Sequence, residues 1–268
     1  MSTDPLTAAC ASAAPGMLLV VTGAGVSLAS GIPTFRGADP GAVWSVDVTE
    51  LGTVEYFRSD PVGSWQWYLG RFGALHGARP NPAHFALAAL ERWHVARGGE
   101  FLLVTQNVDG LHEQAGTHEL VHVHGRADRV RCAEHGCRHG APKGWLPRDA
   151  DRDAAFLREP SEATLPRCPA CGSPLRQHVL WFDESYTGHR DYEIDRVLRA
   201  AKRASVVLFV GTSFAVNIPD LILSRALAKN ARLFALDPVA RDPHPSVVPV
   251  VAAAEERLPA LCRALGAE

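Results

Sequence analysis

The sequence predicts an α/β fold built on a doubly wound parallel sheet, with a small cysteine-rich module and a helical insert added to it. Short apolar runs, typical of strands buried on both faces, alternate along the chain with helical patterns. Glycine-rich and polar segments follow the ends of several of these runs, where open α/β sheets bind ligands. Two stretches break the alternation, and one of them contains four paired cysteines.

Five apolar runs are predicted to be strands, the last of them on the weakest pattern, and three intervening segments have a helical pattern. The strands are Met17–Thr22, Phe101–Thr105, Val206–Val210, Leu233–Leu236 and Val247–Val251, and the helices are Ala83–Trp93, Asp191–Ala201 and Ile218–Lys229.

The two exceptional stretches divide the chain. Residues 41–81, rich in Trp, Tyr and Phe, are expected to form a helical insert. Residues 128–180 are expected to form a small metal-stabilised module, because they lack the apolar residues for a large core. Residues 1–40, 82–127 and 181–268 would then make up one Rossmann-like domain.

Composition excludes several classes of function. The formal net charge of −2 and the lack of a long basic run argue against general affinity for nucleic acid or anionic membranes. A secretory or transit signal would require basic residues, and residues 1–16 contain no Lys or Arg. The apolar runs are too short to span a bilayer. We therefore expect a soluble cytoplasmic protein, and its oligomeric state stays open.

The first motif follows the strand Met17–Thr22. Residues 23–27 read Gly-Ala-Gly-Val-Ser and are expected to enter a helix, although Leu28 stands where the common dinucleotide fingerprint has its third glycine. This pattern alone fits a plain tight turn equally well. Residues 30–36 read Ser-Gly-Ile-Pro-Thr-Phe-Arg, which is more specific. The aromatic ring of Phe35 can shield a reactive sugar carbon, and Arg36 can pair with phosphate.

The second motif follows the strand Phe101–Thr105. Residues 105–116 read Thr-Gln-Asn-Val-Asp-Gly-Leu-His-Glu-Gln-Ala-Gly, and their amides and carboxylate can hold a ribose and a carboxamide. Shortly after it, strand alternation puts His122 and His124 on one face. An imidazole at a strand end before a glycine is well placed to act as a base, since its pKa lies near neutrality.

Both motifs resemble those of the sirtuin family at every specified position. The resemblance implies that NAD is consumed to remove acyl groups from the lysines of proteins or peptides, giving nicotinamide and acyl-ADP-ribose. It implies His124 as the catalytic base, Asn107 and Asp109 at the nicotinamide end of NAD, and Gln106 at the ribose. His122 departs from the family, which usually has a carboxylate there. The other cofactor-binding residues implied are Gly23, Ala24, Gly25, Ser27, Phe35, Arg36, Gly211, Thr212, Ser213 and Asp237.

The four paired cysteines suit a structural zinc ion. Cys168 and Cys171 form a Cys-x-x-Cys pair, and Cys132 and Cys137 are separated by four residues. His135 offers an alternative to Cys137, and the absence of any metal is a further alternative. The resemblance to sirtuins implies a structural zinc at this place. A zinc ribbon can also bind nucleic acid, which the nearly neutral charge does not favour.

Residues 175–184 read Leu-Arg-Gln-His-Val-Leu-Trp-Phe-Asp-Glu and resemble the sirtuin strand against which the substrate peptide pairs. The resemblance implies that Val179 and Phe182 line the tunnel for the acyl-lysine. Asp183 replaces the family glycine and adds bulk and charge where the backbone is expected to be open. The alternative is that this strand belongs to the core alone.

Tyr68 and Arg71 lie three residues apart in a predicted helix and therefore share a face. A Tyr-x-x-Arg at this place resembles the sirtuin branch that removes succinyl, malonyl and glutaryl groups, and a phenol beside a guanidinium would bind a terminal carboxylate. A packed tyrosine beside a solvated arginine is the alternative. The other functions left open are lysine deacetylation, protein mono-ADP-ribosylation and a non-enzymatic NAD-sensing module.

Overall fold

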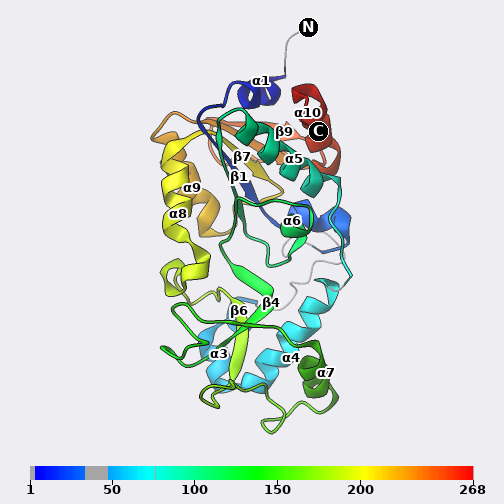
Figure 1. The fold of residues 1–268 in the computed structure, drawn as a ribbon, viewed down its shortest axis with the longest axis vertical. Coiled ribbons are helices and arrows are strands. Elements are labelled where there is room, and N and C mark those ends of the chain that lie inside the picture. Colours follow the sequence, from blue (N-terminus) through cyan, green and yellow to red (C-terminus); the bar gives the residue numbers. More distant parts are fainter. Residues whose placement is uncertain (1–3, 34–47, 76, 268) are drawn as a thin grey trace.

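The computed structural model describes residues 4–33, 48–75 and 77–267. Over these residues six parallel strands form one sheet in the order β3-β2-β1-β7-β8-β9 (Figure 1). Their bounds are β1 Met17–Thr22, β2 Glu100–Thr105, β3 Leu120–His122, β7 Ala204–Val210, β8 Arg232–Asp237 and β9 Val247–Val251. The chain proceeds outward from β1 to β3 and returns at β7 on the other side of β1. The strand order therefore reverses between β1 and β7, and such a reversal is where these sheets bind ligands.

Helices cover both faces of the sheet because successive strand residues point to opposite sides. Leu18 and Val20 pack into one apolar cluster, and Leu19 and Val21 into a second cluster on the other face. Burial of each such side chain contributes about 1.5–3 kcal/mol, an upper estimate for a real unfolded chain. The first face is covered by α1 Pro5–Ala11, α5 Pro82–Ala96 and α10 Ala254–Leu265, and the second by α8 Ile194–Arg203 and α9 Asn217–Leu227 (Figure 1).

The predicted strands are all present, and the three predicted helices appear with shifted ends. α8 begins at Ile194 rather than Asp191, because residues 190–192 form a short 3-10 turn, η4 Arg190–Tyr192. The helix expected after β1 is also a 3-10 helix, η1 Ala24–Ser30, so the α-helical N-terminus expected there is absent from the described residues. α1 and α10 were not predicted from the pattern, and α10 contains Pro259 within it.

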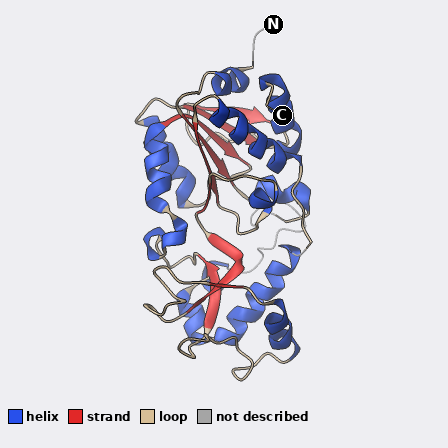
Figure 2. Cartoon of the chain, in the orientation of Figure 1, coloured by secondary structure: helices blue, strands red, loops and turns tan. Residues whose placement is uncertain are grey.

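A second layer of structure lies beyond the carboxyl ends of the parallel strands (Figure 2). Among the described residues it holds a three-stranded antiparallel sheet in the order β5-β4-β6. Its strands are β4 Gly125–Cys132, β5 Leu146–Pro147 and β6 Leu175–Val179, and the helices around it are α2 Val48–Leu51, α3 Val54–Ser59, α4 Pro61–Phe72 and α7 Ala150–Arg158. Trp65 of α4 and Phe156 of α7 meet edge to face in its core, with ring centroids 6.0 Å apart. The described helices of the insert and the cysteine-rich module therefore share one apolar core.

Shorter helical turns connect these layers, namely α6 Leu111–Gln114, η2 Gly73–Leu75 and η3 Tyr186–Gly188. The segment that follows β6 is held by a buried ion cluster in which Glu184 accepts hydrogen bonds from Arg131 and Arg176, each at 2.7 Å. Charge-assisted pairs of this kind have well-defined geometry, so they fix where that segment crosses back to the large sheet. None of the described helices combines the length and the apolar character needed to cross a bilayer.

Candidate active site and zinc centre

The loops that follow β1 and β7 approach each other backbone to backbone. The amide of Gly25 donates to the carbonyl of Gly211 at 3.0 Å. A Cβ atom on Gly25 would lie 2.8 Å from the Cα of Gly211, and one on Gly211, whose φ is +58°, would lie 2.5 Å from the amide nitrogen of Val26. Both positions therefore require glycine, because a side chain would force the two loops apart. The close approach lies at the reversal of the strand order, where a dinucleotide is expected to bind.

The first and second motifs are joined by a buried hydrogen-bond network. The side-chain Nδ2 of Asn107 donates to Ser27 Oγ at 3.1 Å, and Ser27 Oγ donates to Asp109 Oδ2 at 3.0 Å. Burial raises the pKa of Asp109, while hydrogen bonds from the Leu111 amide and from Ser27 oppose the rise. A small cavity of about 20 Å³ is lined by these three side chains together with Ala24 and Leu75. Polar groups with fixed positions at the edge of a cavity are suited to recognise a carboxamide.

His124 lies between β3 and β4, at the edge where these motifs meet. Its Nδ1 is 2.9 Å from the carbonyl oxygen of Gln106, and its Nε2 is 3.2 Å from the hydroxyl oxygen of Tyr186. Because a carbonyl can only accept a hydrogen bond, we assign the ring proton to Nδ1, which leaves a lone pair on Nε2. Burial lowers the pKa of His124 to about 4, although the hydrogen bond to Gln106 favours the charged form. The imidazole is thus neutral near pH 7 and able to take a proton.

This pKa predicts the pH dependence of any reaction in which His124 of the free enzyme is the base. Protonation below about pH 4 would remove the lone pair, so kcat/KM should fall as the pH drops through that value and stay level between about pH 5.5 and 7. An ordinary histidine would place the same fall near pH 6.5. Initial rates measured across this range, with circular dichroism to confirm that the chain stays folded, check the prediction. A fall centred near pH 6.5 would contradict it.

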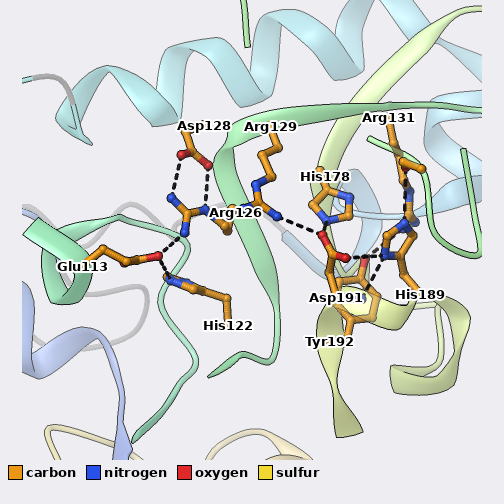
Figure 3. Close-up of polar contacts among 11 residues, drawn as sticks. Glu113, His122, Arg126, Asp128, Arg129, Arg131, His178, His189, Asp191 and Tyr192 are labelled. Carbon is orange, nitrogen blue, oxygen red and sulfur yellow. Dashed lines mark hydrogen bonds and ion pairs between the residues drawn. The ribbon is translucent and has the colours of Figure 1, made fainter. Parts of the chain in front are cut away.

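His122, to which the sequence assigned no role, has a carboxylate partner of its own (Figure 3). Its Nε2 is 2.7 Å from Glu113 Oε1, and its Nδ1 is 3.2 Å from the carbonyl oxygen of Asn107. Glu113 is also paired with Arg126, which in turn binds Asp128 at 2.7 Å. The ring therefore tethers the second motif to β3, the strand that leads to His124.

A second polar cluster in Figure 3 contains His178, His189 and Asp191, whose potential ligand atoms lie within 4.8 Å of one another. Most of its potential ligand atoms are already engaged, although the buried Nδ1 of His178 has no partner among the described residues. Arg129 donates to Asp191 Oδ2 at 2.9 Å, and the two ring nitrogens of His189 contact the Asp191 amide and the Gly144 carbonyl. A nearby guanidinium also repels a cation. The cluster therefore connects β6 to the turn η4 through hydrogen bonds.

The remaining residues expected to bind the cofactor lie along the same edge of the sheet. Gln106 Nε2 donates to Thr212 Oγ1 at 3.1 Å and so connects the ends of β2 and β7. Ser213 is exposed beside Thr212. Asp237 ends β8, where its Oδ1 accepts from the Val239 amide at 2.9 Å and lies 3.3 Å from Arg241 Nε. The predicted sites Phe35 and Arg36 lie outside the described residues.

The four cysteines of the small module come together, as the sequence predicts. The sulfur atoms of Cys132 and Cys171 are 3.4 Å apart, and those of Cys137 and Cys168 are 3.7 Å apart. Four thiolates around a tetrahedral zinc ion, with Zn–S bonds of about 2.3 Å, are separated by about 3.8 Å. The four sulfur atoms lie within 4.8 Å of one another, so the set is complete without His135. These residues fit a closed structural zinc site that leaves no position for water.

Removal of one ligand tests this centre. We expect the unchanged chain to bind about one zinc ion, and we expect Cys168→Ser to lose this ion and to melt at a lower temperature. Structural zinc contributes about 10–16 kcal/mol of binding energy in small zinc-finger peptides. Part of that loss is offset here by the apolar core around Trp65 and Phe156. Cys262→Ala is the matched control, because this buried thiol packs in the other domain near the Ala86 carbonyl. Metal analysis and thermal melts provide the readout, and full zinc content in Cys168→Ser would contradict the assignment.

The residues expected to bind the substrate lie on α4, at the end of β6 and in the segment after it. The rings of Tyr68 and Trp181 are stacked, with centroids 6.1 Å apart, and Tyr68 shares its apolar cluster with Val179 and with partly buried Val108 of the second motif. Phe182 is 49% exposed, so its ring borders the surface. The loop that carries Asn107 and Asp109 thus packs, through Val108, against the same cluster as Tyr68 and Val179.

Arg71 lies one turn beyond Tyr68 on α4, with its guanidinium carbon 4.1 Å from the centre of the Trp67 ring. Burial lowers the pKa of Arg71, and the nearby Tyr68 phenol opposes this shift. Arg71 is therefore partly buried and stacked on an aromatic ring, while Tyr68 is packed in the apolar cluster.

Asp183 has a structural function that the sequence did not predict. Its two carboxylate oxygens accept from the backbone amide of Val54, each at 2.9 Å, and one of them also accepts from the amide of Glu55 at 3.3 Å. A carboxylate at the start of a helix satisfies amides that lack partners within the helix. Asp183 thus binds the start of α3 to the segment after β6.

Tyr186 is the residue of the site that sequence reasoning missed. It follows Glu184 by two positions and contacts His124 from a segment 62 residues away. No local pattern marks it, since a single tyrosine in a polar stretch carries no signal. Only the return of the chain after β6 brings it to the catalytic edge.

Comparison with known proteins agrees with this geometry. Residues 23–218 match the Sir2 family. An NAD-dependent protein deacylase of Thermus thermophilus is 41% identical over 221 residues, which cover 82% of this chain and 78% of that protein. NAD-dependent protein deacylase 1 of Pseudomonas aeruginosa is 39% identical over 248 residues, covering 92% and 93%.

Among solved structures, a Sir2 homologue mutant in complex with ADP-ribose has a TM-score of 0.82 at 32% identity, covering 99% of this chain and 97% of that one. A Sir2 homologue in complex with NAD has a TM-score of 0.77 at 33% identity, covering 99% and 94%. The motifs, the geometry of the two joined loops and these similarities agree: the chain belongs to the Sir2 family.

Proposed function

We propose that this chain is an NAD-dependent protein-lysine deacylase that prefers acyl groups ending in a carboxylate, such as succinyl and malonyl. One observation carries the proposal: three features lie together at the carboxyl ends of the parallel strands. They are the neutral imidazole of His124, the Ser27–Asn107–Asp109 network and the closely packed loops of Gly25 and Gly211. The compared relatives from Thermus thermophilus and Pseudomonas aeruginosa are NAD-dependent protein deacylases.

Each group of the site then has a chemical task. NAD would supply the bond to nicotinamide that breaks and the ribose hydroxyl that receives the acyl group. Asn107 and Asp109 would hold the carboxamide, because both residues line the small cavity beside Ser27. His124 would take the proton of the ribose hydroxyl at Nε2, since its Nδ1 is already committed to the Gln106 carbonyl. Binding both reactants in one cleft makes proximity a major part of the acceleration.

The preference for acidic acyl groups rests on α4. Tyr68 and Arg71 lie on one side of this helix, and Tyr68 shares an apolar cluster with Val179 and Val108. A lysine stem passing Val179 would thus point its acyl end toward α4. Arg71 is half-buried against Trp67, where a guanidinium binds a carboxylate more strongly than it does in water.

A panel of peptides that differ only in the acyl group on one lysine tests the proposal. We expect succinyl- and malonyl-lysine peptides to be turned over with a higher kcat/KM than the acetyl peptide, each with equimolar nicotinamide and the matching acyl-ADP-ribose found by mass spectrometry. A higher kcat/KM for the acetyl peptide would mean that the chain is a deacetylase and would contradict the proposed preference for acidic acyl groups. ADP-ribose attached to protein, with no peptide deacylated, would overturn the deacylase proposal as a whole.

A further inference from the structure

The proton-accepting nitrogen of His124 has a partner before any cofactor binds. The hydroxyl oxygen of Tyr186 lies 3.2 Å from His124 Nε2, and the two rings are stacked with centroids 5.9 Å apart and planes inclined by 25°. Burial raises the pKa of Tyr186 to about 12, so the phenol carries its proton and can donate it to a hydrogen bond. Tyr186 is therefore the donor, and His124 Nε2 the acceptor.

A neutral imidazole has a single acceptor lone pair. That lone pair cannot serve the phenol of Tyr186 and a ribose hydroxyl at the same time. We propose that Tyr186 is a positioning residue that holds His124 in its reactive tautomer in the free enzyme and must release Nε2 when NAD binds. This inference rests on the proposed function, in which the ribose hydroxyl gives its proton to the same nitrogen.

The segment that carries Tyr186 is built to allow such a release. On one side, Glu184 is fixed by Arg131 and Arg176, and on the other His189 is buried. Between them lies the short turn η3, in which Thr187 and Gly188 are exposed. A Cβ on Gly188 would meet no atom within 4 Å, so the turn has open space beside it. The proposed release would therefore move this turn together with the Tyr186 ring, which packs partly buried against the second apolar cluster, while both ends of the segment stay in place.

The consequence is a competition that binding measurements detect. NAD must replace the phenol at Nε2, and one hydrogen bond of this kind has a net value of about 0.5–1.5 kcal/mol, or roughly a 2- to 10-fold change in affinity. Tyr186→Phe keeps the stacked ring and removes only the hydroxyl. We therefore expect the Kd of NAD, measured by calorimetry without peptide, to fall by about 2- to 10-fold in Tyr186→Phe.

A double-mutant cycle shows whether this effect acts through the imidazole. Once His124 is replaced in His124→Ala, the further change Tyr186→Phe should leave the Kd of NAD unchanged, because the shared lone pair is gone. Tyr56→Phe is the matched control, since the hydroxyl of Tyr56 in α3 contacts Asp60 at 3.5 Å, and its loss should not alter the affinity. Nitrogen NMR of histidine-labelled protein adds a signature: in the free chain Tyr186→Phe should move the Nε2 resonance of His124 and leave Nδ1 nearly unchanged.

The outcomes separate this inference from the proposed function. Unchanged or weaker NAD binding by Tyr186→Phe, or tighter binding that persists in the His124→Ala background, would overturn the role of Tyr186 even if the chain deacylates peptides. Tighter binding that depends on His124, in a chain that deacylates no peptide, would support the inference and remove the proposed function. If the unchanged chain fails to bind NAD, both are wrong.

Discussion

His124→Ala should lower the rate of peptide deacylation by about 10²- to 10⁴-fold, the usual contribution of a general base. The physical reason is that, among the described residues, neither hydrogen-bond partner of His124 (Gln106 and Tyr186) offers a basic nitrogen that could accept the proton in place of Nε2. The loss should appear in kcat, because the proton is taken after both reactants have bound. Steady-state rates with a succinyl-lysine peptide at saturating NAD provide the measurement.

The same variant should still exchange labelled nicotinamide into NAD when peptide is present. We expect the bond to nicotinamide to break before the ribose hydroxyl gives its proton to His124, so the reversal of that cleavage does not need the imidazole. His118→Ala is the matched control, because this histidine is exposed on the loop before β3 and should keep full activity. An unchanged rate of deacylation in His124→Ala would show that His124 is not the base. Equal loss of nicotinamide exchange and deacylation would indicate that His124 acts in binding instead.

Arg71→Met should reduce kcat/KM for a succinyl-lysine peptide by about 10- to 100-fold, since hydrogen bonds to charged groups have net values of about 1.5–3 kcal/mol. Methionine has a similar unbranched chain and keeps the packing against Trp67 without the charge. The acetyl peptide carries no carboxylate and should be turned over as before. The ratio of the two kcat/KM values, measured on one preparation, reports the preference independently of protein stability.

Two further variants sharpen this result. Arg71→Lys keeps the charge but cannot form the two parallel hydrogen bonds of a guanidinium, so its loss should be intermediate. Arg58→Met removes an exposed arginine from neighbouring α3 and should affect neither peptide. If Arg71→Met lowers both activities equally, the arginine supports the fold of α4 and does not select the acyl group.

Much of the large sheet was open to prediction from local pattern. Strands such as Met17–Thr22 and Val206–Val210 are buried on both faces, so their residues are almost all apolar, and this signal does not depend on the rest of the chain. The grouping of the four cysteines could likewise be anticipated, because paired thiols at short spacing converge on one ion. Helix α10 was missed, since Pro259 interrupts a pattern that tertiary packing of Leu258 and Leu261 stabilises.

The motifs by themselves predicted which residues carry the chemistry: the sequence around Gly23, Asn107 and His124 was enough to indicate a site for NAD. Tertiary structure alone decided how these residues are held. Asp183 binds the start of α3, and Tyr186 reaches the lone pair of His124, through contacts between segments far apart in the chain. Motif residues are constrained by their ligand and therefore form a local sequence pattern. A residue such as Tyr186 forms no such pattern, because its contact with His124 depends on the packing of all the elements that lie between the two in the chain.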